Sequence, residues 1–269
     1  MLAVFGKKIA NPPQELSLPF KGRGNLKTRE EVAALISSGR ADLTRYMFCN
    51  GDFMAVSHQD EHATHPRISF ISLSTCKNFG CARSIVVIDD IFCIFNGYLH
   101  NTCDLRRRYG LSRQATEAMV VVEAYKVLRD RAPYPADQVI KELDGKFSFI
   151  LFDSRATKLF LARDRDGSAE LHWGVAADGC LVCSDDPGIV RKSCGDRYTP
   201  FPPGCLFKSE EGLISFDHPL NKVRGVIRED DEGYGSAVIF QVDLFTRLQS
   251  IPRRGSDANW SSVTAIEGD

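Results

Sequence analysis

A group of histidines and carboxylates is the first set of residues whose types and spacing suggest chemistry. Imidazole and carboxylate groups at such intervals can bind a metal ion when a helix brings them to one side. This group follows a strand-like segment and ends at Pro66, a context typical of a solvent-exposed loop. The sequence therefore predicts no metal site and no cofactor. The group consists of His58, Asp60, Glu61, His62 and His65.

Cysteine thiols are the second set of candidate reactive groups. The chain has nine cysteines without regular spacing, and several lie in apolar runs, as free thiols do in a reducing compartment. Cys180 and Cys183 are three positions apart, which on a strand places them on opposite faces and argues against a zinc or redox pair. Four other cysteines are candidates for a nucleophile, although no spacing pairs them with a base: Cys49, Cys76, Cys81 and Cys103.

The composition narrows the class of partner. The 269 residues are 43% hydrophobic and 26% charged, with a formal net charge of -1, as in an ordinary globular protein. Nucleic-acid binding normally needs clustered Lys and Arg on one face, which this sequence lacks. The apolar run of residues 2–5 is too short for a signal peptide, and no stretch has the length of a membrane span. We therefore expect a cytoplasmic or nuclear protein that binds no nucleic acid and does not span a membrane.

Strands dominate the elements that must position these residues. Residues 44–57 predict a hairpin around Asn50-Gly51, a dipeptide suited to positive φ angles. Residues 84–97 predict a second hairpin around Asp89-Asp90. Further strands are expected over 2–5, 67–73, 147–152, 159–162, 171–175, 180–184, 205–208, 213–216 and 237–242.

Helices are expected at three places. Thr28 and Glu31 form a capping-box pattern ahead of a helix over 29–38. Residues 115–128 carry a broad apolar face that ends before two prolines, and residues 135–143 predict a shorter helix. The pattern as a whole indicates an α+β fold in which helices cover sheets.

A series of short motifs between residues 84 and 208 carries a family resemblance. They are NGYLHN at 96–101, LR at 105–106, LDGKFSF at 143–149, ARDRDG at 162–167, LHWG at 171–174 and FPPG at 201–204. In this order they resemble the glutaminase domain of class II glutamine amidotransferases, the N-terminal-nucleophile group that includes the front half of asparagine synthetase. The shared order is more specific than any single motif.

A narrower resemblance covers nearly the whole chain. The YGL motif at 109–111 and the LRDR motif at 128–131 are similar to signatures of plant aluminium-induced, stem-specific-like proteins, as are the first and last segments. The resemblance implies a four-layer αββα sandwich of the N-terminal-nucleophile hydrolase type. Because no linker composition appears, we expect one domain over 1–245, followed by a polar tail over 246–269.

The glutaminase chemistry implied by the wider resemblance needs a nucleophile at the start of the chain. In the family this is normally residue 2, exposed when Met1 is removed, whereas this chain has Leu2. Leucine has neither thiol nor hydroxyl, and its bulk disfavours removal of Met1, so the free α-amine that would act as base is missing as well. The sequence therefore favours a protein without catalysis, and it assigns no catalytic residue.

Other parts of the family's site are partly retained. The resemblance implies that the Asn96 side chain and the Gly97 N–H form an oxyanion hole. Tyr98 and Ala115 stand where the family has acidic residues, so the carboxylates that would pair with a substrate ammonium are absent. Arg67 is a weak candidate for the arginine that holds the substrate carboxylate. The possible pocket comprises Leu2, Arg67, Tyr98 and Ala115.

A structural role is the alternative interpretation for most motif residues. Asn96-Gly97 is equally typical of a turn after a strand. The charged residues of the ARDRDG motif more often fix a turn than do chemistry. The residues to which we assign a structural role are Tyr109, Gly110, Leu111, Leu128, Arg129, Asp130, Arg131, Asp144, Gly145, Arg163, Asp164 and Gly167.

These observations favour one function and leave two alternatives. The favoured function is a non-catalytic amidotransferase-like protein of the plant response to aluminium, hormone or nutrient status, which binds a small ligand or a protein. The first alternative is an unconventional amidohydrolase or glutaminase with a substitute nucleophile, which predicts a thiol of low pKa near Asn96. The second is a dimeric interaction scaffold whose pocket is filled by Leu2 and its neighbours. A homodimer is expected by analogy with the family.

Overall fold

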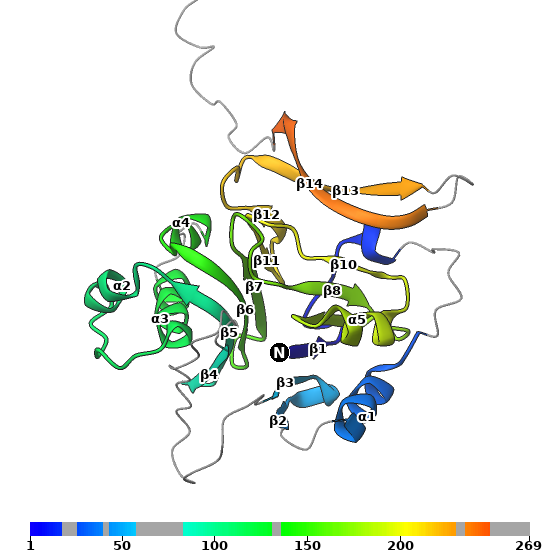
Figure 1. Cartoon of the computed structure of the whole chain (residues 1–269), viewed down its shortest axis with the longest axis horizontal. Helices are drawn as coiled ribbons and strands as arrows, with labels where there is room; N and C mark the ends of the chain where they lie inside the picture. Colours follow the sequence, from blue (N-terminus) through cyan, green and yellow to red (C-terminus); the bar gives the residue numbers. More distant parts are fainter. Residues whose placement is uncertain (18–25, 40–42, 58–82, 131–135, 230–234, 248–269) are drawn as a thin grey trace, which may run out of the picture.

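The computed structural model describes residues 1–17, 26–39, 43–57, 83–130, 136–229 and 235–247. Its strands form two sheets, in which all strand pairs are antiparallel (Figure 1). The expected segments 58–65 and 67–73 and the residue Arg67 lie outside the described residues.

The larger sheet has eight strands in the order β14-β13-β12-β11-β7-β6-β5-β4. The strands are β4 (Arg83–Ile88), β5 (Ile91–Leu99), β6 (Gly145–Asp153), β7 (Lys158–Arg163), β11 (Cys205–Lys208), β12 (Gly212–Ser215), β13 (Asn221–Glu229) and β14 (Gly235–Arg247). The smaller sheet has six strands in the order β10-β8-β9-β1-β3-β2. These are β1 (Leu2–Phe5), β2 (Leu43–Met47), β3 (Phe53–Ser57), β8 (His172–Val175), β9 (Leu181–Ser184) and β10 (Tyr198–Pro200).

Helices cover the outer face of each sheet (Figure 1). The helices α2 (Thr102–Arg108), α3 (Glu117–Asp130) and α4 (Ala136–Lys141) pack on the eight-stranded sheet, whereas α1 (Arg29–Gly39) and α5 (Pro187–Cys194) pack on the six-stranded sheet. Two short 3-10 turns, η1 (Gln14–Ser17) and η2 (Cys49–Gly51), complete the described elements. The expected four-layer αββα sandwich is therefore confirmed.

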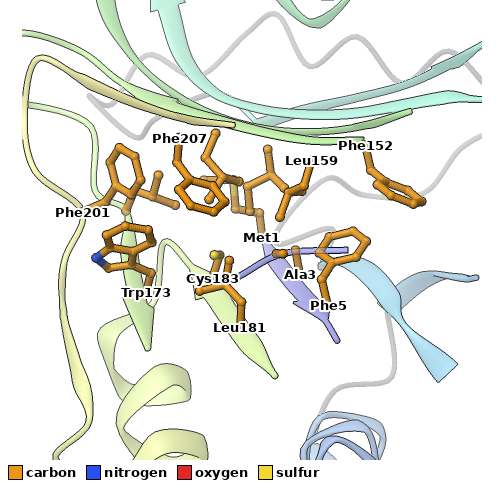
Figure 2. Packing of buried hydrophobic residues seen from close by; sticks show 14 of the residues in the cluster. Met1, Ala3, Phe5, Phe152, Leu159, Trp173, Leu181, Cys183, Phe201 and Phe207 are labelled. Atoms are coloured by element: carbon orange, nitrogen blue, oxygen red, sulfur yellow. The ribbon is translucent and has the colours of Figure 1, made fainter. Parts of the chain in front are cut away.

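Each pair of neighbouring layers encloses its own hydrophobic core. The core between the two sheets is rich in aromatic residues, and Figure 2 shows Met1, Ala3 and Phe5 of the first strand facing Phe152, Leu159 and Phe207 across it. Side chains alternate along a strand, so Leu2 and Val4 point the other way, into the core beneath α1 and α5. A third core lies between the eight-stranded sheet and α3.

Both predicted hairpins are confirmed. Asp89 and Asp90 form a two-residue turn with φ angles of 51° and 63°, between the paired residues Ile88 and Ile91. Asn50 and Gly51 also have positive φ angles, of 65° and 79°. They lie inside a longer connection, because the pairing of β2 with β3 ends at Met47 and Phe53.

The predicted helices are confirmed as well, with shifted ends. The capping box before α1 is present, since the Thr28 N–H donates to Glu31 Oε2 at 2.7 Å and the Glu31 N–H donates to Thr28 Oγ1 at 3.4 Å. Sequence patterns missed α2, α5, β10 and β13, which are short or interrupted by glycine. They also placed the last strand over 237–242, whereas β14 ends at Arg247, beyond the expected domain boundary at 245.

Candidate functional site

Polar groups gather at one end of the core between the sheets. On β5, β6 and β7 the apolar residues that face this core give way to Asn96, Ser148 and Arg163, which are paired in register across the sheet. On the six-stranded sheet, β1 starts at this same end. Its last residue, Phe5, lies at the opposite end of the core, where the ring centroids of Phe5 and Phe152 of β6 are 4.7 Å apart. We call Asn96, Ser148, Arg163, Asp185 and the Met1 ammonium the polar end.

The Met1 ammonium is held inside this polar end. Its nitrogen lies 2.6 Å from Asp185 Oδ1, and the two side chains are 0% and 4% exposed. The Ser184 hydroxyl donates to the Met1 carbonyl at 2.7 Å. The Met1 side chain is buried in the core between the sheets. The start of β1 therefore offers an apolar side chain and an ion-paired amine.

Leu2 does not share this space. Its side chain is buried on the opposite face of β1, with Val32 of α1 and Val190 of α5. Of the expected pocket residues that the structure describes, Leu2 and Ala115 do not meet, since Ala115 lies just before α3, on the far side of the eight-stranded sheet. There, the Ala115 carbonyl accepts hydrogen bonds from the Arg106 guanidinium.

Asn96 lies at the polar end, on the face of β5 that is directed at the core between the sheets. It is 3% exposed, and its Oδ1 has no hydrogen-bond partner among the described residues. A buried acceptor without a partner is costly, which makes it a position where a ligand donor gains binding energy. Gly97 follows with a φ of 119°, and a Cβ there would lie 2.0 Å from the Lys146 carbonyl oxygen. Only glycine fits this crossing of β5 and β6.

Tyr98 is exposed at the end of β5. Its ring meets His100 edge-on, with 5.1 Å between the ring centroids. By strand alternation it lies on the same face as Asn96, and in register with Lys146 of β6. The side chain at this position is therefore a phenol, where the resemblance implies a carboxylate.

The residues of the ARDRDG motif fix a turn. Asp164 is buried, and its carboxylate accepts hydrogen bonds from the backbone N–H groups of Phe147, Ser168 and Ala169 at 2.9–3.1 Å. Arg163 donates to three backbone carbonyls, at 2.6–2.7 Å: those of Gly167, Ala169 and Phe201. All of these hydrogen bonds join a charged side chain to the backbone, as expected for a structural role.

The YGL and LRDR motifs belong to the outer helical layer. Tyr109 follows α2, and the Leu111 N–H donates to the Arg106 carbonyl at 2.8 Å. Leu128 and Arg129 lie in α3, where Arg129 contacts the buried carboxylate of Asp153 at 3.3 Å. Gly110 lies in the turn after α2 and has a φ of 66°. In α3, the Asp130 carboxylate pairs with the Arg129 guanidinium at 2.8 Å. Arg131 lies outside the described residues.

The loop before β6 is tied to α2. The Asn101 side chain accepts from the Asp144 N–H at 3.2 Å, and the His100 N–H donates to the Asp144 carbonyl at 2.7 Å. Gly145 then starts β6 opposite Leu99.

The described cysteines are poor nucleophiles where they are buried. Burial raises the pKa of the Cys180 and Cys205 thiols to about 12. Burial also raises the pKa of the Cys93, Cys183 and Cys194 thiols. Cys49 and Cys103 are exposed, on η2 and α2. Cys76 and Cys81 lie outside the described residues.

Three polar residues near the chain start were missed by sequence reasoning. Ser148 donates to the Glu170 carbonyl at 3.0 Å, Asp185 pairs with Met1, and His172 is in register with Ser184 on the adjacent strand. Burial lowers the pKa of His172 below its usual 6.5. In the sequence, each of these residues lies at the end of an apolar strand segment, and this position is the signal that could have identified them. Among the described residues, no group of three or more His, Cys, Asp or Glu side chains is placed to hold a metal ion.

Comparisons with known proteins show which sequences this chain is similar to. A protein-family profile described as "Aluminium induced protein" matches residues 2–242. The stem-specific protein TSJT1 of Nicotiana tabacum is 59% identical over 165 residues, which are 61% of this chain and 100% of that protein. Asparagine synthetases [glutamine-hydrolyzing] are more distant: the Zea mays enzyme is 26% identical over 58% of this chain, which spans 25% of that enzyme.

Solved structures give weaker similarity. Glutamine phosphoribosylpyrophosphate amidotransferase from B. subtilis matches with a TM-score of 0.38 and 19% identity, over 46% of this chain and 28% of that one. A glutamine aminotransferase class-II domain protein from silicibacter pomeroyi matches with a TM-score of 0.35 and 15% identity, over 48% and 68% of the two chains. In the part of the chain that the structure describes, no helix is long and apolar enough to cross a membrane.

Proposed function

Because the chain belongs to the aluminium-induced protein family, we propose that it is a non-catalytic, amidotransferase-like protein of the plant response to aluminium, hormone or nutrient status. It acts by binding a small ligand or a protein partner rather than by hydrolysing glutamine. The similarity to asparagine synthetases supports the amidotransferase part of this proposal, and the family description supports the link to aluminium. We place the protein in the cytoplasm or the nucleus, as a homodimer.

The observation that carries the proposal is the apolar start of β1. Met1 and Leu2 are buried in two different cores, and neither supplies a thiol or hydroxyl. The Met1 ammonium forms an ion pair with Asp185, and in this protonated form it has no lone pair with which to accept a proton. Removing an attacking group leaves only the residual acceleration that oriented hydrogen-bond donors provide.

Asn96 and Gly97 support a retained binding role. The carboxamide of Asn96 is buried at the polar end with its Oδ1 unpaired, so a ligand with an N–H or O–H donor would satisfy it. The groups that would pair with the ammonium of free glutamine are replaced at Tyr98 and Ala115. The ligand is therefore expected to differ from free glutamine at its amine end.

A substitute cysteine nucleophile has no support among the described residues. The thiols nearest to the chain start are buried with raised pKa values, which lowers the fraction of reactive thiolate at neutral pH. The exposed thiols of Cys49 and Cys103 lie on a turn and an outer helix, away from the polar end.

A glutamine hydrolysis assay tests the proposal. The wild-type chain is compared with a variant in which a cysteine is inserted between Met1 and Leu2, so that after removal of methionine the cysteine takes the place of Met1. This design follows from the alternation of β1, because Leu2→Cys would direct its thiol towards α1 and α5. An inserted alanine is the matched control, and intact-mass spectrometry identifies the first residue of each chain.

We expect no ammonia release from the wild type or the alanine variant. Release by the cysteine variant would support a binding site that lacks only its nucleophile. Inactivity of all three proteins would support the absence of catalysis, and it would mean that the changes at Tyr98 and Ala115 also prevent productive binding of free glutamine. Hydrolysis by the wild type above a heat-treated sample would overturn the non-catalytic proposal.

A further inference from the structure

A strip of polar side chains continues outwards from Asn96 along the neighbouring strands β5 and β6 (Figure 1). Asn96 is paired in register with Ser148, and two residues further along the sheet Tyr98 is paired with Lys146. Phe147, between Lys146 and Ser148, is buried in the core with α3, so alternation directs these four side chains to the other face, towards the polar end. We call Asn96, Ser148, Tyr98 and Lys146 the polar strip.

The inner end of the polar strip is a buried hydrogen-bond acceptor without a partner. Asn96 is 3% exposed, and its Oδ1 accepts no hydrogen bond from any described residue. The Ser148 hydroxyl beside it does not satisfy this oxygen, because it donates to the Glu170 carbonyl at 3.0 Å. Asn96 therefore selects a ligand group that carries an N–H or O–H donor.

The outer end of the polar strip offers a cation and a hydroxyl. Lys146 is exposed, and it forms no ion pair or hydrogen bond with any described residue. Tyr98 is 42% exposed, so its phenol O–H is accessible to a ligand. A carboxylate is the group that suits both residues, because it accepts hydrogen bonds from an ammonium and from a hydroxyl.

The polar strip itself contains no carboxylate, and the carboxylates of the surrounding segments have other roles. Asp185 is paired with the ammonium of the chain start at 2.6 Å. Asp164 accepts hydrogen bonds from three backbone N–H groups. Glu170 favours the charged form of Arg163. A ligand ammonium next to Lys146 would therefore meet a like charge on the strip and no opposite one.

The spacing along the strands limits the size of the ligand. A strand rises about 3.4 Å per residue, so the two ends of the polar strip are separated by about 7 Å of backbone. A carboxylate and a primary amide joined by three methylene groups extend over roughly the same length. A compact, linear molecule can therefore reach both ends.

We propose that the polar strip binds a short carboxylate that has an amide at its far end and no ammonium next to the carboxylate. Glutaramate, which is glutamine without its α-amino group, is the simplest member of this class. Lys146 and the Tyr98 hydroxyl bind its carboxylate, and Asn96 Oδ1 accepts a hydrogen bond from its amide N–H. This inference rests on the binding role in the proposed function and names the class of ligand.

Ligand-observed NMR titration of the full chain measures this preference. Glutaramate is compared at low salt with glutamine, which adds the α-ammonium, and with butyramide, which lacks the carboxylate. We expect glutaramate to bind at least about tenfold more tightly than either of the others. Equal affinities for glutaramate and glutamine would overturn the inference, and so would the absence of glutaramate binding at about 10 mM.

Matched variants assign the contacts at the two ends. Lys146→Met should weaken the binding of glutaramate about fivefold and leave that of butyramide unchanged. Lys192→Met, at an exposed position of α5, is the control and should change neither affinity. Asn96→Leu should abolish the binding of both ligands, with its fold checked by circular dichroism. Unaltered glutaramate binding in Lys146→Met or Asn96→Leu would contradict the proposed contacts.

Tyr98→Glu provides the reverse test. It places a carboxylate on the polar strip, so the ratio of glutamine affinity to glutaramate affinity should rise about tenfold. An unchanged ratio would contradict the assignment of the outer end. Affinity and catalysis are measured separately: a failure of these titrations would leave the absence of ammonia release intact. Ammonia release by the wild type would overturn the non-catalytic proposal whichever ligand binds more tightly.

Discussion

Single residues fix the ends of the strands that frame the polar end. Asp164 holds three backbone N–H groups and Arg163 holds three carbonyls, so this charged pair acts through the main chain. Hydrogen bonds to a buried carboxylate are stronger than neutral ones, and losing them leaves unsatisfied donors. Charged residues that suggest catalysis in a sequence can therefore have only a structural role in a turn.

Asp164→Asn should show the size of this contribution. We expect a loss of about 2–4 kcal/mol in the free energy of unfolding, because the amide lacks the charge and one acceptor oxygen. Asp166→Asn, at an exposed position of the same turn, is the control and should change stability by less than about 0.5 kcal/mol. Urea unfolding measures both. Equal effects would argue against the hydrogen-bond account.

Gly97→Ala tests the close crossing of β5 and β6. The new Cβ would lie 2.0 Å from the Lys146 oxygen at a φ of 119°, so the backbone must shift. Gly110→Ala has a φ of 66° with no heavy atom within 4 Å, and it isolates the conformational cost alone. We expect about 1 kcal/mol for Gly110→Ala and at least about 3 kcal/mol for Gly97→Ala. Thermal unfolding by circular dichroism would show the difference, and comparable losses would contradict it.

His172 should make stability depend on pH. Burial lowers its pKa below 6.5, so the unfolded chain binds a proton more readily than the folded chain. The stabilisation is complete above the unfolded pKa and declines as the pH falls from about 6.5 towards the lowered value. His172→Gln should flatten the profile of melting temperature between pH 7.5 and 5 relative to the wild type, and an unchanged profile would contradict the role of His172.

At the scale of elements, local signals decide where strands and helices begin. Asp89-Asp90 adopts the positive φ angles of its turn, and Thr28 with Glu31 closes the capping box. In both cases the residues involved are no more than three positions apart, so the feature can be recognised from the sequence alone. Elements that depend on distant contacts, such as β13 against η1, have no comparable local signal.

Glu31→Ala tests the capping box. We expect a loss of about 1 kcal/mol in the free energy of unfolding, because the Thr28 N–H loses its acceptor at 2.7 Å. Glu30→Ala alters the neighbouring residue of the same helical turn, and it retains the cap. Its effect should be smaller, about 0.3 kcal/mol, from the helix dipole alone. Urea unfolding of both variants measures this difference, and equal losses of stability would contradict the role of the capping box.

At the scale of the molecule, the two sheets share one core and should unfold together. Phe5 of the smaller sheet contacts Phe152 of the larger one, and Trp173 packs against Phe201 and Phe207 (Figure 2). A side chain that bridges both sheets contributes to the stability of each. The described molecule is therefore expected to unfold as a cooperative unit.

Phe5→Ala should destabilise both sheets at once. A buried phenylalanine replaced by alanine costs about 3–5 kcal/mol, whereas Met47→Ala, at a side chain that is 56% exposed, should cost less than about 1 kcal/mol. Far-ultraviolet circular dichroism reports the strands, and tryptophan fluorescence in a Trp260→Phe background reports the surroundings of Trp173. Coincident midpoints at a lower urea concentration are expected. Separate midpoints would contradict a shared cooperative core.

The sequence by itself determined the hairpins, the first helix and the α+β class. These features depend on residue type and on contacts between near neighbours. The ordered motifs also indicated the four-layer sandwich and the family, because their order is a property of the chain alone.

Only the tertiary structure decided which residues meet. Alternation along the chain directs the Met1 and Leu2 side chains into different cores, and the pairing of β1 with β9 brings Asp185 to Met1 across 184 positions of sequence. Pairing of β5 with β6 likewise sets Ser148 beside Asn96, and β14 becomes a sheet edge only through the order of its neighbours. Register and sheet order depend on packing between distant segments, which residue spacing along the chain does not encode.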